Sequence, residues 1–398
     1  MIRLFRYLGP LAVQTAGSGA TFAIAILLTR FAGIETQGQF SFIKSWSDTA
    51  LTGLLFGLPQ SLLHLSYHSD RTPSELYTFV LRYAKRLLLA ALAVGGIAWG
   101  FGVSWLIWVS ISAPALVLHG LVRSLLLRPC GPLTYAWITV LPALSLLAAV
   151  SAGILLGIQQ WGACILASAL LSAAACLWVA KRSGLSREGH VRGLGPESAT
   201  TNVHAFVQSI LSAAQVSGLL SLAGLLGAST SDVGELSLAF LAIQVLAVVA
   251  GFAAPAVYNA FAPNLGFQAL LVEHKEVVWA AVLMLLLVLP ITLLRMPWIL
   301  ESLFKVSTQS AIMACRIALV AGVFVLFNRF LSTLLQRAGY FVTLSKQSVA
   351  RFVITFGLMV LVVHFIDTLT ISEAGALSIL IAEVVLFVWM IWTMRRFH

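Results

Sequence analysis

Two charged residues stand four positions apart inside an apolar stretch near the start of the chain. The stretch FSFIKSWSDTALTGLLFGLPQS, residues 40–61, has the composition of a membrane helix but contains Lys44 and Asp48. An isolated charge at the centre of a bilayer costs about 3 kcal/mol or more, and residues four apart share one face of a helix. The spacing therefore predicts one of two arrangements. Either the two residues form a self-neutralising pair that packs against protein, or they line a water-filled cavity where Lys44 attracts phosphate or sugar and Asp48 modulates that attraction.

Other charged and polar side chains in or beside apolar runs are further candidates. Arg316 either binds an anionic substrate or extends to the outer interface, and Arg30 is either an interfacial anchor or a ligand contact. Arg123 lies near the inner end of its run, where it binds phosphates of the inner leaflet or of the substrate. His204 is a packing residue or a proton relay, and Gln244 is a polar residue at a matching depth in the second half. The candidate substrate-binding residues are thus Lys44, Asp48, Arg316, Arg30, Arg123, His204 and Gln244.

A second pair of charges lies close to the expected midplane of the membrane. Arg351 is about 16 Å deep from one side and Glu383 about 18 Å deep from the other, at 1.5 Å of rise per helical residue, in a hydrocarbon core roughly 30 Å thick. Their predicted helices follow each other through a short turn. We therefore expect a buried ion pair between Arg351 and Glu383, with the alternative that Glu383 carries a coupling proton.

The overall composition decides the class of protein. Of 398 residues, 60% are hydrophobic and 10% are charged, whereas soluble domains carry roughly 25% charged residues. The net charge of +10 does not indicate nucleic-acid binding, because the basic residues fall between apolar runs instead of on a soluble domain. No motif for an enzyme, an ATP site, a metal or another cofactor is present, and the four Cys residues show no pairing pattern. The sequence predicts a polytopic membrane protein without catalytic residues.

The apolar runs predict the number of membrane spans. Runs of about 20 apolar residues, the length that crosses a bilayer, number twelve: 9–29, 40–66, 86–103, 104–127, 132–157, 161–180, 203–227, 235–258, 278–296, 308–330, 340–366 and 371–394. Lys and Arg mark the cytoplasmic side, and the predicted outer loops hold only Arg30, Arg295 and Lys305. Twelve transmembrane helices with both termini in the cytoplasm are therefore expected.

An interruption near the middle divides these spans into two groups of six. Residues 181–202 are basic and rich in Gly and Ser, the composition of a flexible linker. The predicted organisation is an N-terminal six-helix lobe at 1–180, a cytoplasmic linker at 181–202 and a C-terminal six-helix lobe at 203–398. At an offset of 196 residues, Gly38, Phe56 and Pro59 recur as Gly234, Phe252 and Pro255. The two lobes are thus expected to be pseudo-symmetric repeats related by an axis along the membrane normal.

A cytoplasmic segment before the third span has helix-start signals. In TPSELYTFVLRYAKR, Thr72 is placed as the N-cap, Pro73 at the first helical position and Glu75 at the third. Its apolar residues recur at helical spacing, so it is expected to lie on the inner leaflet as an amphipathic helix.

Motifs around the first two spans carry a family resemblance. The first span ends in a basic residue before a Gly-x-x-x-x-Gly-x-aromatic turn and the second closes with Gly-Leu-Pro, here Arg30, Gly33, Gly38 and Phe40, then Gly57, Leu58 and Pro59. The chain thereby resembles the polysaccharide-type flippases of the MOP superfamily, O-antigen and exopolysaccharide translocases with a MATE-like fold. The stretch VRSLLLRPCGPLTYAW is similar to that family's junction between the fourth and fifth helices. The chain departs from the family in its seventh helix, where His204, Gln208 and Gln215 stand in place of the usual cations.

The resemblance implies both a fold and a function. It implies two six-helix bundles around a central cavity, working by alternating access in the bacterial inner membrane. The implied substrate is an undecaprenyl-pyrophosphate-linked oligosaccharide, moved from the inner to the outer leaflet, with membrane lipids and a glycan polymerase or other export components as partners. A MATE-like cation-coupled antiporter for drugs or metabolites is the alternative. Such relatives need a carboxylate in the first helix of a lobe, and residues 9–29 and 203–227 contain none, although Asp48 could substitute.

Overall fold

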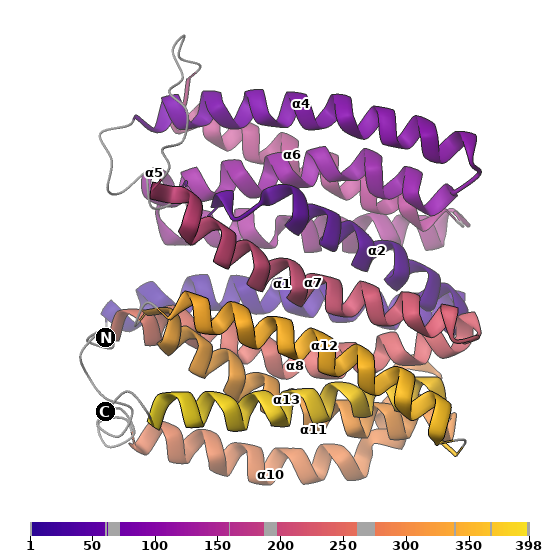
Figure 1. Ribbon diagram of the computed structural model, residues 1–398. Helices are drawn as coiled ribbons and strands as arrows, with labels where there is room; N and C mark the ends of the chain where they lie inside the picture. Colours follow the sequence, from indigo (N-terminus) through magenta and orange to yellow (C-terminus); the bar gives the residue numbers. More distant parts are fainter. Residues whose placement is uncertain are drawn as a thin grey trace. The chain divides into compact units, whose positions relative to one another are not determined.

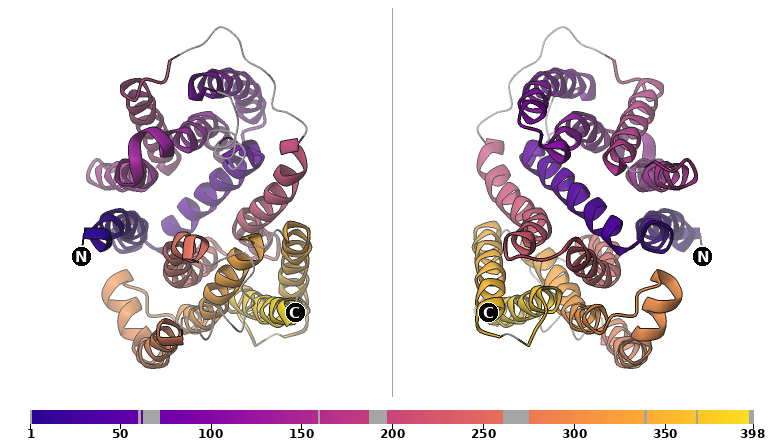
Figure 2. Two further views of the ribbon diagram at one scale, coloured as in Figure 1. Left: turned by 90° about the vertical axis from the view of Figure 1, so that its left-hand side faces the viewer. Right: turned by 90° about the vertical axis from the view of Figure 1, so that its right-hand side faces the viewer.

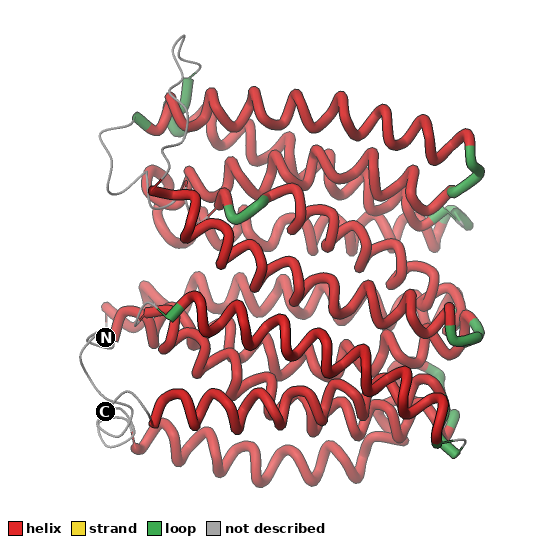
Figure 3. The backbone as a smooth tube through the Cα atoms, viewed as in Figure 1, coloured by secondary structure: helices red, strands yellow, loops and turns green. Residues whose placement is uncertain are grey.

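The computed structural model describes residues 2–59, 62, 72–158, 160–186, 197–260, 275–337, 340–366 and 368–395, and this described part is helical throughout, without a strand (Figure 3). In chain order the elements are α1 (Ile2–Ala32), α2 (Ile34–Leu55), α4 (Pro73–Gly100), α5 (Ser104–Leu155), α6 (Trp161–Arg182), α7 (Glu197–Leu225), α8 (Thr230–Ala260), α10 (Lys275–Ile299), the π-helical turn η1 (Leu300–Phe304), α11 (Gln309–Arg337), α12 (Phe341–Phe365) and α13 (Ile371–Arg395) (Figure 1).

The helices are long and apolar enough to cross a membrane. Within the described residues, ten segments meet the length and composition of a span, and two of these ten lie in α5. The predicted spans 40–66 and 86–103 are not among the ten, and residues 60, 61 and 63–66 of the first lie outside the described residues. The protein is therefore a multi-pass membrane protein, and the count of twelve spans stays a prediction.

Two compact units make up the chain, Met1–Phe31 with Phe40–Ser217, and Ala32–Gln39 with Gly218–His398. In each unit the helices run side by side, so that the views in Figure 2 look along many of them. The division differs from the predicted lobes at 1–180 and 203–398, because the first part of α7 belongs to the first unit. There Ser217 Oγ lies 2.8 Å from Thr49 Oγ1 on α2. Residues 187–196 of the predicted linker at 181–202 lie outside the described residues.

The start of α4 follows the sequence signals but packs differently from the prediction. Thr72 is the N-cap, with extended backbone, and its Oγ1 accepts a hydrogen bond of 3.1 Å from the backbone N–H of Glu75. The prediction of a separate helix on the membrane surface is wrong. The segment continues without a break to Gly100 as part of α4. Leu76 and Val80 are fully buried in a core with residues of α5 and α6. The apolar stripe of this segment is thus a packing surface inside the first unit.

A glycine divides the longest helix. α5 runs over 52 residues, but Gly131 has φ 74° and ψ 170°, backbone angles that lie outside the helical region. Such a positive φ is accessible to glycine without a steric cost. The predicted spans 104–127 and 132–157 meet at this break, and His119 and Arg123 precede it by three and two helical turns.

The end of α2 is held in an unusual backbone conformation. Phe56 has φ 45° and Gly57 has φ 69°, so α2 ends at Leu55, directly before the Phe-Gly-Leu-Pro sequence. A left-handed conformation is costly for a bulky residue. The Tyr83 hydroxyl of α4 donates a hydrogen bond of 2.5 Å to the Leu54 carbonyl, which supports the interrupted helix. Burial raises the pKa of the Tyr83 phenol, so this donor keeps its proton.

In the second unit, the first turns of α2 cross α8 at two glycines. A Cβ on Gly38 would lie 2.5 Å from the Thr230 carbonyl oxygen and 2.9 Å from the Gly234 nitrogen. A Cβ on Gly234 would meet the carbonyl oxygen of Ile34, again a backbone atom. The two glycines that the repeat alignment pairs are therefore in direct contact, and each is required for the other's close approach.

Candidate functional site

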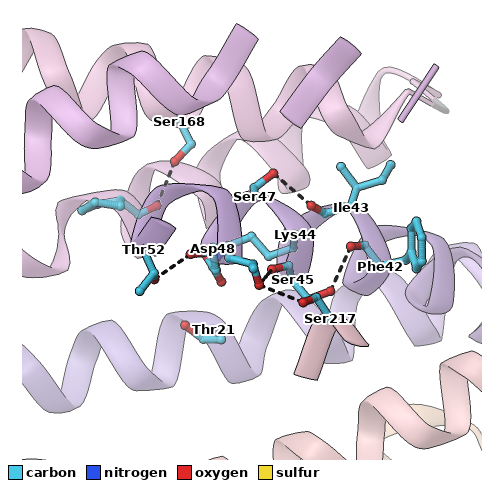
Figure 4. Close-up of polar contacts among 12 residues, drawn as sticks. Thr21, Phe42, Ile43, Lys44, Ser45, Ser47, Asp48, Thr52, Ser168 and Ser217 are labelled. Atoms are coloured by element: carbon cyan, nitrogen blue, oxygen red, sulfur yellow. Dashed lines mark hydrogen bonds and ion pairs between the residues drawn. The ribbon is translucent and has the colours of Figure 1, made fainter. Parts of the chain in front are cut away.

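Lys44 and Asp48 form an ion pair on α2. Lys44 Nζ lies 2.5 Å from both carboxylate oxygens of Asp48 (Figure 4). The Lys44 side chain is 34% exposed and the Asp48 side chain 49%. Because neither charge is enclosed by protein, a ligand can reach both without unfolding of the helix.

Buried residues of α2 beside the pair fix its orientation. Ser45, Ser47 and Thr49 are buried, and Thr49 is bonded to Ser217 of α7. Thr52 continues the exposed side one turn after Asp48, and its hydroxyl donates to the Asp48 carbonyl at 2.8 Å (Figure 4). We call Lys44, Asp48 and Thr52 the α2 polar face.

The chemistry of the α2 polar face is that of binding. A lysine ammonium offers three donors and a positive charge, and a carboxylate offers acceptors only. An exposed pair at this spacing is worth about 0.3–0.5 kcal/mol in water, so Lys44 can exchange Asp48 for a phosphate oxygen at small cost. Asp48 is then available to accept hydrogen bonds from sugar hydroxyls.

A second charged group lies in the interior of the second unit. Arg351 Nη1 of α12 is 3.3 Å from Glu383 Oε1 of α13, with side chains 20% and 2% exposed. Asn328 of α11 donates to Glu383 Oε2 at 2.7 Å and to the Glu383 carbonyl at 2.9 Å. The Glu383 carboxylate therefore links α13 to α12 through the Arg351 guanidinium and to α11 through the Asn328 amide.

Arg316, expected as a substrate ligand or an interfacial residue, contacts a neighbouring helix. Its Nε donates to the Leu293 carbonyl of α10 at 3.1 Å. Pro297 stands four residues after Leu293 in the same helix and has no N–H to offer that carbonyl. Arg316 thus replaces the hydrogen bond that the proline removes.

The hydrogen bond from Arg316 to the Leu293 carbonyl is expected to contribute to stability. Arg316→Met is expected to lower the free energy of unfolding by about 1–3 kcal/mol, because a partly buried carbonyl loses its charged donor. In a Pro297→Ala background, a backbone N–H is available to Leu293, and the same change should cost much less. Thermal unfolding of the four variants in detergent measures the difference. Equal losses in both backgrounds would contradict the proline-replacement role.

The remaining predicted residues are spread over several helices. Arg30 is exposed at the last turn of α1, and His204 is partly buried on α7. Gln244 is exposed on α8 and belongs to a different unit from Asp48. Arg123 is partly buried on α5. Among described residues, the structure brings together two pairs of opposite charge, Lys44 with Asp48 and Arg351 with Glu383. Within the same part of the chain, no group of three metal-ligating side chains occurs.

Sequence reasoning missed a buried carboxylate at the start of α8. Glu235 is 4% exposed and accepts hydrogen bonds from Thr308 at 2.7 Å, Ser310 at 2.7 Å and Ser372 at 3.2 Å. These hydroxyls stand at the N-terminal ends of α11 and α13, where the helix dipole favours a negative charge. The signal in the sequence was a glutamate in an apolar run, but its donors are distant in the chain. Glu235 fastens α8 to α11 and α13.

Comparison with known proteins identifies the fold. No protein-family model and no curated protein matches the sequence. An inward-facing multidrug-resistance MATE family transporter of the MOP superfamily matches with a TM-score of 0.71 and 15% identity, over 98% of each chain. The lipid II flippase MurJ, in an inward closed conformation, matches with a TM-score of 0.71 and 11% identity, over 98% of this chain and 87% of MurJ. A MOP superfamily transporter from Pyrococcus furiosus matches with a TM-score of 0.66 and 15% identity, over 98% and 94%.

These similarities cover almost the whole chain and agree on one architecture. The chain therefore has the fold of the MOP superfamily transporters, which includes both multidrug transporters and a lipid flippase. The matched proteins are transporters and flippases, not enzymes. The expected MATE-like fold is confirmed at this level.

Proposed function

We propose that the protein is a flippase for a lipid-linked oligosaccharide of the undecaprenyl-pyrophosphate type in the bacterial inner membrane. It would move this substrate from the inner to the outer leaflet for O-antigen or exopolysaccharide synthesis, by alternating access. Twelve spans with both termini in the cytoplasm belong to this proposal. Glycan polymerase or other export components would receive the product.

The α2 polar face is the observation that carries the proposal. A lysine about a third exposed, held by a carboxylate one turn away, suits a substrate with phosphate and hydroxyl groups. The lipid II flippase MurJ shares the fold, which supports a lipid-linked substrate without identifying it. The absence of acidic residues from 9–29 and 203–227 is also more readily compatible with an anionic substrate than with a cationic drug.

A MATE-like antiporter is the second candidate. The buried Glu383, with 2% of its side chain exposed, and the half-exposed Asp48 are carboxylates that a coupling cation or proton could use. The antiporter hypothesis predicts that drug or metabolite efflux depends on Asp48 or Glu383. The flippase hypothesis predicts that glycan export depends on Lys44 instead.

Lys44→Ala is expected to lower glycan export about tenfold or more, the factor for losing one charge-assisted hydrogen bond. The measurement is surface glycan, together with lipid-linked oligosaccharide retained in the inner leaflet, in cells whose only copy carries the variant. Lys346→Ala, at an exposed lysine of α12, is the matched control and should leave export unchanged.

Protein levels are measured in parallel, so that lost export is separated from lost folding. Normal export by Lys44→Ala at normal protein level would contradict the role of the α2 polar face. Normal glycan export combined with lost drug resistance in Asp48→Asn would favour the antiporter.

A further inference from the structure

Arg123 is a cation whose charge the described residues around it do not balance. Its Nε is fully enclosed and has no hydrogen-bond partner within the part of the chain that the structure describes. Neither ion pair found among the described residues includes it. A guanidinium keeps its charge at every physiological pH, and an enclosed donor without an acceptor is costly. Such a group calls for a negatively charged partner.

The described side chains next to Arg123 supply no such partner. His119 Nε2, one turn earlier, lies 3.0 Å from the Ile138 carbonyl oxygen, which can only accept, so this nitrogen carries a proton. The Ser124 hydroxyl donates to the Gly120 carbonyl at 3.0 Å. Arg123 itself lies 5.9 Å from the centre of the Tyr135 ring, a weak attraction. These neighbours are uncharged or engaged elsewhere.

The wider surroundings are positive. The start of α4, the break in α5 and the end of α6 meet at one end of the first unit, through contacts of Ser186 with Ser74 at 3.3 Å and of Cys130 with Ser183 at 3.0 Å. The described residues of these three elements include one carboxylate, Glu75 at the start of α4, and six cations: Arg82, Lys85, Arg86, Arg123, Lys181 and Arg182. The positive charges therefore outnumber the negative one. The field at this end therefore attracts anions.

The break in α5 adds donors at the same place. The helix restarts after Gly131, and the first N–H groups of a helix have no carbonyl partner within it. Tyr135, in this first turn, has a hydroxyl that forms no hydrogen bond within the described part of the chain. The guanidinium, the phenol and the helix start thus offer donors to one ligand.

We infer that Arg123 and Tyr135 form a phosphate-binding site at this end of the first unit. Leu121, Val122 and Leu125 beside Arg123 are buried and apolar. The ligand chemistry is a phosphate group, carried by a lipid headgroup or present as a free phosphate. This site goes beyond the proposed function, because it needs no glycan and does not involve the α2 polar face.

Titration of the purified full-length protein in mixed micelles tests the site. Phosphatidylglycerol is compared with diacylglycerol, which lacks the phosphate, and bound lipid is measured by native mass spectrometry and by the melting temperature. Phosphatidylglycerol should bind and raise the melting temperature, and diacylglycerol should not. Arg123→Gln should bind roughly tenfold more weakly, the factor for a lost charge-assisted hydrogen bond.

Arg295→Gln is the matched control, because Arg295 is an exposed cation of α10 in the second unit and does not belong to the basic group of α4, α5 and α6. It should bind like the unmodified protein. Inorganic pyrophosphate distinguishes the source of the phosphate: competition with phosphatidylglycerol indicates recognition of a free phosphate, and its absence indicates a lipid-borne one. Equal binding by Arg123→Gln, or an equal loss in Arg295→Gln, would overturn the site. If Arg123→Gln does not fold, Arg123→Lys and Tyr135→Phe are measured in its place. Unchanged affinity for phosphatidylglycerol in both of these variants would also overturn the proposed site.

Discussion

Replacing Glu383 by glutamine is expected to lower the free energy of unfolding by about 3–5 kcal/mol, the cost of removing one partner of a buried ion pair. The carboxylate is 2% exposed and lies 3.3 Å from the Arg351 guanidinium, which would be left without a counter-charge. Adding Arg351→Gln should recover part of the loss, because no uncompensated charge then remains. Chemical unfolding in detergent micelles compares the two variants with the unmodified protein.

An exposed acidic residue provides the control for this prediction. Glu301→Gln, at the exposed glutamate of η1, should change stability by no more than about 0.5 kcal/mol. If the double variant is no more stable than Glu383→Gln alone, the two side chains do not act as a pair. If Glu383→Gln is stable but loses transport, a role in proton coupling is favoured instead.

The same glycine-to-alanine change is expected to have opposite effects at two positions. Gly234→Ala places a methyl group against the backbone oxygen of Ile34, so α2 and α8 must move apart. Overpacking of this kind costs about 1–3 kcal/mol, and more where the neighbour is rigid backbone. Gly357→Ala in α12 meets no atom within 4 Å. It should stabilise the helix by about 0.5–1 kcal/mol, because alanine has the higher helix propensity.

Melting temperatures of the two purified variants test this contrast, and transport assays show whether the crossing is needed for function. A Gly234→Ala protein as stable as Gly357→Ala would show that the crossing at Gly38 and Gly234 tolerates a side chain. Gly38→Ala should resemble Gly234→Ala, since its methyl group would also face backbone atoms of α8.

Local spacing made several features predictable from the sequence. The contact between Lys44 and Asp48 follows from four-residue spacing on one helix, and the proximity of Arg351 and Glu383 follows from counting depth along two adjacent helices. The apolar runs fixed most helix positions because membrane spans need a minimum length. The N-cap at Thr72 is likewise a local signal.

Features that depend on distant residues were not predictable in the same way. Glu235 has donors more than seventy positions away, so nothing near it in the chain indicates its environment. Arg316 bonds to a carbonyl that Pro297 leaves free, which requires knowledge of which helices are neighbours. The segment after Thr72 was predicted on the membrane surface because an apolar stripe alone does not distinguish lipid from protein as its partner.

The crossing of α2 and α8 also affects the order in which the molecule can be assembled. Residues 32–39 pack with the second unit, yet they leave the ribosome before nearly all of it. The packing surface at Gly38 therefore stays uncovered until Gly234 has been synthesised, almost two hundred residues later. A fragment beginning at Gly218 would lack these turns of α2 altogether. The two halves of the chain are thus not independent folding modules, and the early segment must be kept in the membrane without its partner until α8 has been inserted.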